Sequence, residues 1–141
     1  MVAAIAMLVG VGGTAAVLAV SDRFGPPRHE YRVAVFLDHE ITADQKAAVE
    51  TALARLHPVD GVTFESREQA WAKFQEMFKD RPELINSTKP QDLPESFHLT
   101  TTGTEFDCAA LAPVRALPGV NEISVVQPAK DGRPGAVIDC G

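Results

Sequence analysis

The stretch YRVAVFL at residues 31–37 decides the fold, because it is the clearest strand in the sequence. Every second residue from Tyr31 to Leu37 is apolar, so these side chains share one face of the strand. The stretch GVTFE at residues 61–65 repeats the alternation over a shorter length. Both stretches are therefore predicted to belong to one sheet.

A helix is predicted between these two strands. Thr42 can cap its first turn, and Gln45 follows at the spacing of a capping box. Val49 and Leu53 lie on its apolar side, and Pro58 ends it. The first half of the chain is therefore a β-α-β unit.

The second half repeats this order with a strand at 96–102, a helix at 104–117 and a strand at 120–126. Two such units predict an α+β fold, a ferredoxin-like split β-α-β sandwich in which helices cover one face of a four-stranded antiparallel sheet. Residues 128–141 contain several Gly and Pro and are predicted to form a C-terminal tail.

Residues 66–95 separate the two units by more than an ordinary connection and are predicted to form a helical insert. Ser66 and Gln69 form a second capping box, and Pro82 suits the first position of another short helix. The apolar side chains could be the core of a small lobe, or they could form a groove for a partner helix. The predicted partner-binding residues are Trp71, Phe74, Met77, Phe78, Leu84 and Ile85.

Residues 2–20 are apolar apart from Thr14, and every formal charge lies at Asp22 or later. Residues 1–21 are therefore predicted to be a transmembrane anchor or a signal peptide, with a buried helix as the alternative. Residues 22–29 contain two consecutive prolines and are predicted to be a linker. Arg23, Arg28 and Arg32 follow the apolar stretch and, by the positive-inside rule, would place the body in the cytoplasm.

The charge balance argues against several function classes. The chain has 13 Lys and Arg against 19 Asp and Glu, a formal net charge of −6. This balance argues against a partner that is a nucleic acid or an anionic lipid.

The four histidines lack the spacing of metal ligands, and no nucleophile elbow, phosphate-binding loop or Cys-x-x-Cys motif occurs. We therefore expect no enzyme activity, no metal and no cofactor.

The insert carries a family resemblance. SREQAWAKFQEMFKD at 66–80 resembles a motif of FtsX, a cell-division membrane protein, and LPESF at 93–97 and LPGV at 117–120 are also similar to family positions. The resemblance covers residues 30–127 and is to the extracellular, permease-like domain. It implies a domain outside the cytoplasm that binds a peptidoglycan hydrolase or a coiled-coil hydrolase regulator.

The chain differs from that family in having one candidate membrane segment where FtsX has four. No contact with the ATPase partner of FtsX is therefore expected. The resemblance outweighs the three arginines and predicts a single-pass membrane protein whose body lies outside the cytoplasm, or a secreted protein.

An extracytoplasmic location also bears on the two cysteines. Outside the cytoplasm, Cys108 and Cys140 are expected to form a disulfide that holds the tail against the preceding helix. The alternative is two free thiols.

The leading hypothesis is a non-enzymatic binding module in cell division or cell-wall remodelling that docks a hydrolase or its regulator through the insert. The alternative is a ferredoxin-like ligand-sensing or dimerisation domain.

Overall fold

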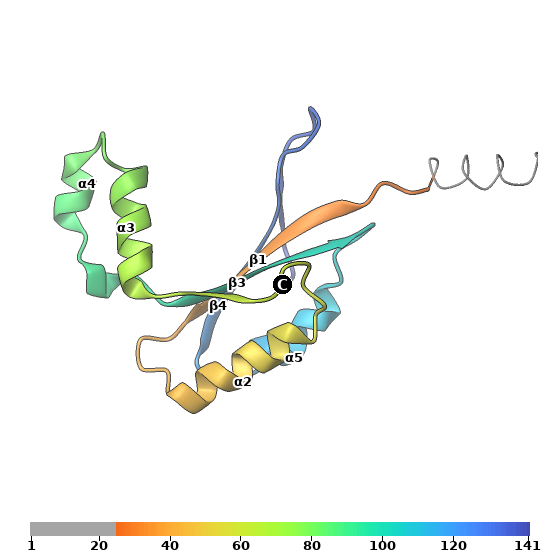
Figure 1. The fold of residues 1–141 in the computed structure, drawn as a ribbon, viewed down its shortest axis with the longest axis horizontal. Coiled ribbons are helices and arrows are strands. Elements are labelled where there is room, and N and C mark those ends of the chain that lie inside the picture. Colours follow the sequence, from red (N-terminus) through yellow and green to blue (C-terminus); the bar gives the residue numbers. More distant parts are fainter. Residues whose placement is uncertain (1–24) are drawn as a thin grey trace, which may run out of the picture.

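The computed structural model describes residues 25–141 (Figure 1). The predicted anchor or signal peptide and the first residues of the predicted linker lie outside this range. Within residues 25–141, no helix has the length and apolar character needed to cross a membrane.

The body is an antiparallel sheet of five strands in the order β2-β3-β1-β4-β5. The strand bounds are β1 His29–Leu37, β2 Thr63–Glu65, β3 Ser96–Gly103, β4 Val120–Gln127 and β5 Ala136–Ile138. The first four strands have the order of a ferredoxin-like sheet, and the predicted α+β fold class is confirmed. The central position of β1 explains why its apolar alternation is the strongest strand signal.

Helix α2 (Ala43–Ala54) and the short helix α5 (Ala112–Arg115) cover one face of this sheet (Figure 1). Alternate residues of β1 point toward them, and Val33 lies opposite Leu99 of β3 and Val125 of β4. The core residues are 0–5% exposed: Tyr31, Val33, Val35, Leu37, Val49, Leu53, Phe97, Leu99, Leu111, Val114 and Val125.

The capping box predicted for α2 is present. Thr42 Oγ1 accepts a hydrogen bond from the backbone N–H of Gln45, and Gln45 Oε1 accepts one from the N–H of Thr42. The helix begins at Ala43 and buries Val49 and Leu53 completely. Gly119 has a φ of 89°, and a Cβ there would lie 2.6 Å from the side chain of Ile41, so this turn requires glycine.

The helix predicted over residues 104–117 is wrong in its first part. Asp107 caps a 3₁₀ turn, η2 (Cys108–Leu111), by accepting a hydrogen bond from the N–H of Ala109, and α5 follows directly. An Asx cap competes with helix extension toward Thr104, because it satisfies the first free N–H groups at Asp107. Leu111 and Val114 are buried, whereas Phe106 and Leu117 are partly buried against the core.

Residues 128–141 are not a plain tail, because they contain β5 and a hairpin turn. Asp131 and Gly132 have φ angles of 52° and 75°, which suit the tight turns that join antiparallel strands. Val126 pairs with Val137 and Val125 with Ile138, so β5 extends the sheet beyond the four predicted strands.

The insert lobe, residues 66–95, lies between β2 and β3. It contains α3 (Arg67–Met77), α4 (Pro82–Ser87) and the 3₁₀ turn η1 (Pro90–Asp92). Figure 1 shows α3 and α4 beyond one end of the sheet, at the opposite end of the long axis from the start of β1. The helices predicted from Ser66 and Pro82 therefore form, and they stand apart from the covered face of the sheet.

Candidate binding surface on the insert lobe

The start of α3 is fixed by its capping box. Ser66 Oγ accepts a hydrogen bond from the backbone N–H of Gln69, and Gln69 Oε1 accepts one from the N–H of Ser66. The helix ends at Met77, and the N–H of Arg81 donates to the carbonyl of Phe78 at 2.8 Å as the chain turns into α4. Pro82 occupies the first turn of α4, where its missing N–H has no cost.

Two aromatic residues of α3 and the residue that caps its C-terminal end form a ladder along one side of the helix. The rings of Trp71 and Phe74 stack at 5.7 Å with an interplanar angle of 14°, and those of Phe74 and Phe78 lie 4.7 Å apart at 51°. Spacings of three and four residues place these side chains on one side of the helix. The structure therefore brings the three predicted aromatic residues together as one surface.

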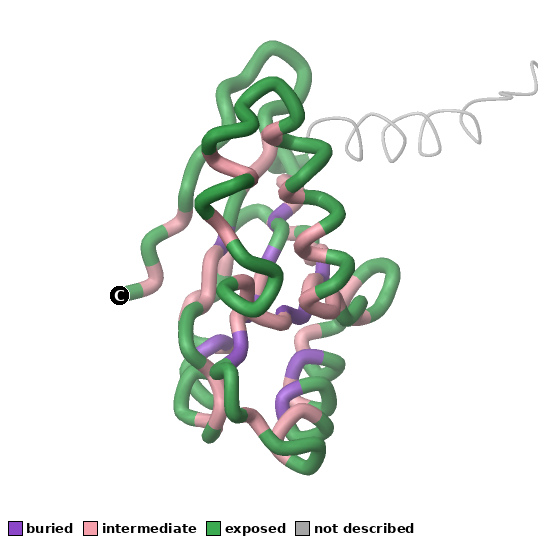
Figure 2. The backbone as a smooth tube through the Cα atoms, turned by 90° about the vertical axis from the view of Figure 1, so that its left-hand side faces the viewer, coloured by how far each residue is buried: buried purple, intermediate pink, exposed green. Residues whose placement is uncertain are grey.

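This surface is not sealed. Neither α3 nor α4 contains a buried residue. Trp71, Phe74 and Phe78 are partly buried, as are Leu84 and Ile85 of α4, whereas Met77 is 73% exposed. Figure 2, viewed from the side of the lobe, shows only partly buried and exposed backbone there, whereas buried segments lie in the sheet and α2.

Polar contacts tie both ends of the lobe to the body. Arg67 Nη2 donates to the carbonyl of His39 at 2.8 Å at the start of the lobe. At its end, Lys46 Nζ donates to Glu95 Oε2 at 2.9 Å. Lys73 of α3 also forms an ion pair with Glu65 of β2. The orientation of the lobe therefore depends on side-chain contacts near its two connections.

Sequence reasoning missed a polar group beneath the lobe. Ser96 Oγ lies 2.8 Å from His98 Nε2, and the same nitrogen lies 4.0 Å from Glu65 Oε2. Both contacts use one ring nitrogen, whereas a catalytic relay needs the base to bridge nucleophile and acid through two. Ser96 is also only 1% exposed. The group is therefore a structural network. It could not be predicted from the sequence, because it forms only when β2 and β3 pair in the register that places Glu65 opposite Ser96.

The two cysteines lie on the body. Cys108 of η2 is bonded to Cys140, and Arg115 Nη1 donates to the carbonyl of Cys140 at 3.1 Å. Cys140 packs against the core, so the bond holds the end of the chain to the covered face of the sheet. In the part of the chain that the structure describes, no three His, Cys, Asp or Glu side chains gather as metal ligands would.

The fold and this surface define an α+β domain with a helical insert, and comparison with known proteins identifies its family. The family model for the FtsX extracellular domain matches residues 30–130, so the chain belongs to the FtsX extracellular domain family. The resemblance inferred from the insert motif is thereby confirmed. Membership places the domain in the context of cell division and outside the cytoplasm, and this domain is not catalytic in FtsX.

A solved structure supports the fold. The chain is similar to extracellular domain 1 of FtsX from S. pneumoniae, in complex with undecyl-maltoside, with 17% sequence identity and a TM-score of 0.51. The match covers 65% of this chain and 90% of that one. Among curated proteins, none matches the sequence significantly.

Proposed function

We propose that the chain is a non-enzymatic binding module that docks a peptidoglycan hydrolase, or its coiled-coil regulator, on the insert lobe. The observation that carries the proposal is the incomplete burial of all six predicted residues, with Met77 73% exposed. The body would be tethered through residues 2–20, or secreted, and would face the cell wall. Family membership supports such a partner, because the FtsX domain binds regulators of these enzymes.

The docking would bury an apolar helix face against the aromatic ladder. Fully burying a large apolar side chain contributes about 1.5–3 kcal/mol. Met77 has most of that contribution still to gain, and the other five side chains would bury the part that solvent still reaches. Trp71 and Phe74 provide rigid aromatic area, whereas Met77 can adapt its shape to the partner. An amphipathic helix is the expected ligand, since it presents apolar residues at the same spacing.

The pneumococcal domain supports this chemistry indirectly. It was crystallised with undecyl-maltoside, an amphiphile with an alkyl chain. An alkyl chain and an apolar helix face are attracted to the same kind of surface. In this chain we assign that property to the insert lobe.

The alternative function, a ligand-sensing or dimerisation domain, has one observation in its favour. A hollow of about 410 Å³ lies over strands β3, β1 and β4, and its lining includes Ala34, Ser124 and Val126. These residues alternate with the core residues of their strands and therefore lie on the face opposite α2 and α5. A ligand or second copy that used this face would leave the insert lobe unused.

Site-specific crosslinking in cells tests the proposal. A photoreactive residue at Gln75, an exposed position on α3, is introduced into the full chain, and the crosslinked proteins are identified by mass spectrometry. We expect a peptidoglycan hydrolase or a coiled-coil regulator, and we expect its recovery to fall at least about five-fold in the double variant Trp71→Ala/Phe74→Ala.

The matched control is Val126→Ala/Val137→Ala, which removes two exposed apolar side chains that face each other across β4 and β5. It should leave recovery unchanged. Equal recovery from the Trp71→Ala/Phe74→Ala variant and the unchanged chain would contradict docking on the lobe. Loss of recovery in the control alone would favour the open sheet face.

A further inference from the structure

Basic residues line the hollow where the start of β1 lies beside the β4–β5 hairpin. The hollow between the start of β1 and the β4–β5 hairpin has a volume of about 330 Å³. Four of the 13 Lys and Arg residues line it, against two of the 19 Asp and Glu. We call the four cations, Arg28, Arg32, Lys130 and Arg133, the basic end. Its lining is net positive although the whole chain has a formal charge of −6.

The hairpin holds two of these cations opposite each other. The backbones of Lys130 and Arg133 exchange two hydrogen bonds of 3.2 and 2.9 Å around the turn at Asp131 and Gly132. Like charges directly opposite on antiparallel chains destabilise the pairing. A bound anion would offset that repulsion, so the turn is suited to an anionic ligand.

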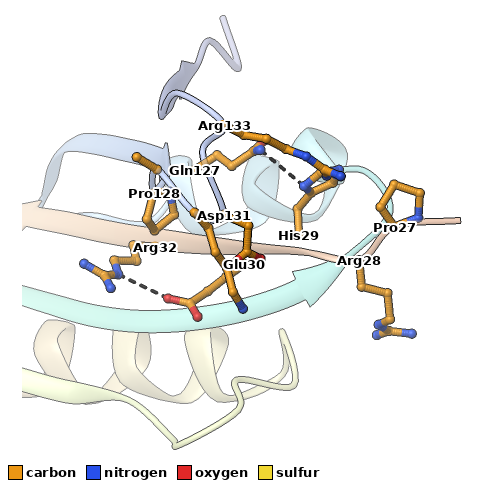
Figure 3. A pocket seen from close by; sticks show the side chains of 11 residues that line it. Pro27, Arg28, His29, Glu30, Arg32, Gln127, Pro128, Asp131 and Arg133 are labelled. Atoms are coloured by element: carbon orange, nitrogen blue, oxygen red, sulfur yellow. Dashed lines mark hydrogen bonds and ion pairs between the residues drawn. The ribbon is translucent and has the colours of Figure 1, made fainter.

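Arg28, just before β1, and Arg32, within it, line the same hollow (Figure 3). The side chain of Arg28 points away from the hairpin, and its Nη2 donates to Thr102 Oγ1 at 3.4 Å. Gln127 Nε2 lies 3.2 Å from His29 Nδ1 and thereby joins the end of β4 to the start of β1. Arg32 Nε contacts Glu30 Oε1 at 3.3 Å, but 67% of the arginine side chain remains exposed. Arginine presents five N–H donors, so this single contact leaves donors for phosphate oxygens.

The position of the basic end indicates its ligand. The apolar stretch at residues 2–20 precedes it closely in sequence, and the start of β1 lies at the opposite end of the long axis from the insert lobe (Figure 1). We propose that the basic end binds the headgroup phosphates of an anionic phospholipid bilayer and so holds the domain with its insert lobe directed away from the membrane. This proposal rests on the membrane tether in the proposed function, and it does not depend on hydrolase docking.

Electrostatics supports both parts of the proposal. Cations close to an anionic membrane surface are attracted to it, and the attraction falls off within a Debye length of about 8 Å in physiological salt. The rest of the domain carries most of the acidic residues and is repelled by the same surface. The overall acidity of the sequence, which argues against an anionic-lipid partner, therefore conceals a local charge separation that favours one.

Hydrogen exchange on the full chain in nanodiscs tests the proposal. Exchange at residues 128–135 is compared between discs of phosphatidylcholine alone and discs with about one third phosphatidylglycerol. We expect exchange to be at least about five-fold slower in the anionic discs, and the difference to shrink at high salt. The variant Lys130→Ser/Arg133→Ser should abolish the difference. The control Lys79→Ser/Arg81→Ser, which makes the same charge change on the lobe, should retain it.

Other results of this experiment would contradict the proposal. Equal exchange in the two kinds of disc, or a difference that survives Lys130→Ser/Arg133→Ser, would contradict lipid binding by the basic end. Equal slowing by inorganic phosphate with neutral discs would assign the site to a soluble anion instead. A chain that does not copurify with either disc would contradict the tether itself.

Discussion

The body and the insert lobe use the same local signal for different purposes. Helices α2 and α3 both begin with a capping box, formed by Thr42 and Gln45 in one and by Ser66 and Gln69 in the other. Helix α2 then buries its apolar side chains against the sheet, whereas α3 buries none completely. The difference teaches that a helix signal and an apolar stripe do not by themselves show whether the stripe stabilises the fold or is left for a partner.

The two regions are also held differently. The body has a closed core, whereas the lobe is tied to it by contacts such as those of Arg67 with His39 and of Lys46 with Glu95. A hydrogen bond from a charged group, such as that of Arg67, typically contributes about 1.5–3 kcal/mol, and an accessible ion pair contributes about 0–1 kcal/mol. The lobe is therefore held by a few polar contacts at its connections, whereas the body is held by its apolar core.

The largest expected effect compares a core and a lobe side chain. Leu53→Ala should lower the free energy of unfolding by about 2–5 kcal/mol, because Leu53 is 0% exposed and its removal leaves a cavity. Phe74→Ala removes more atoms but should cost less, since solvent already reaches Phe74. Urea denaturation of both variants measures the difference. A larger loss for Phe74→Ala would mean that the lobe, not the sheet, holds the decisive core.

The disulfide should stabilise the body and not the lobe. Cys108→Ser/Cys140→Ser opens a loop with a sequence separation of 32 residues. We expect a loss of about 2–4 kcal/mol in unfolding free energy, mainly from the greater entropy of the unfolded chain. Hydrogen exchange should show faster exchange in β5 and η2 and no change in α3. Unaltered exchange in β5 would show that the hairpin is held without the bond.

The smallest effect concerns the two caps. Thr42→Ala and Ser66→Ala should each cost about 0.5–2 kcal/mol of helix stability. The loss in α2 should lower the global unfolding free energy, because that helix packs on the core. The loss in α3 should appear chiefly as faster local exchange, since its helix buries no residue. Equal global losses would show that lobe and body unfold as one unit.

Much of the fold was accessible from local sequence. The strands were indicated by alternation, and both long helices by their capping boxes, because these signals act within a few residues. The extent of the helix before β4 was not, since the cap at Asp107 shortens it. The fifth strand was missed although Asp131-Gly132 is a strong turn signal, because β5 has only three residues.

One of the two candidate surfaces could be predicted from the sequence, and the other could not. The apolar stripe on α3 could be predicted because helical spacing alone places Trp71, Phe74 and Phe78 together. The basic end could not, because Arg28 and Arg133 line one hollow only after β4 and β5 have paired. The solvent exposure of the apolar side chains of the insert could not be predicted from the sequence either. The sequence left a lobe core and a partner groove as alternatives, and only tertiary structure shows how much solvent reaches each side chain.

The most direct test of the central claim uses two side chains of similar exposure in the two regions. Met77 is 73% exposed on the lobe and Val137 is 77% exposed on β5. For Met77→Ser and Val137→Ser, both the unfolding free energy and the affinity for the crosslinked hydrolase or regulator are measured. We predict that both variants keep their stability within about 0.5 kcal/mol. Only Met77→Ser should weaken the complex, by about five-fold or more. Unchanged affinity in Met77→Ser, or an equal loss in Val137→Ser, would contradict docking on the insert lobe.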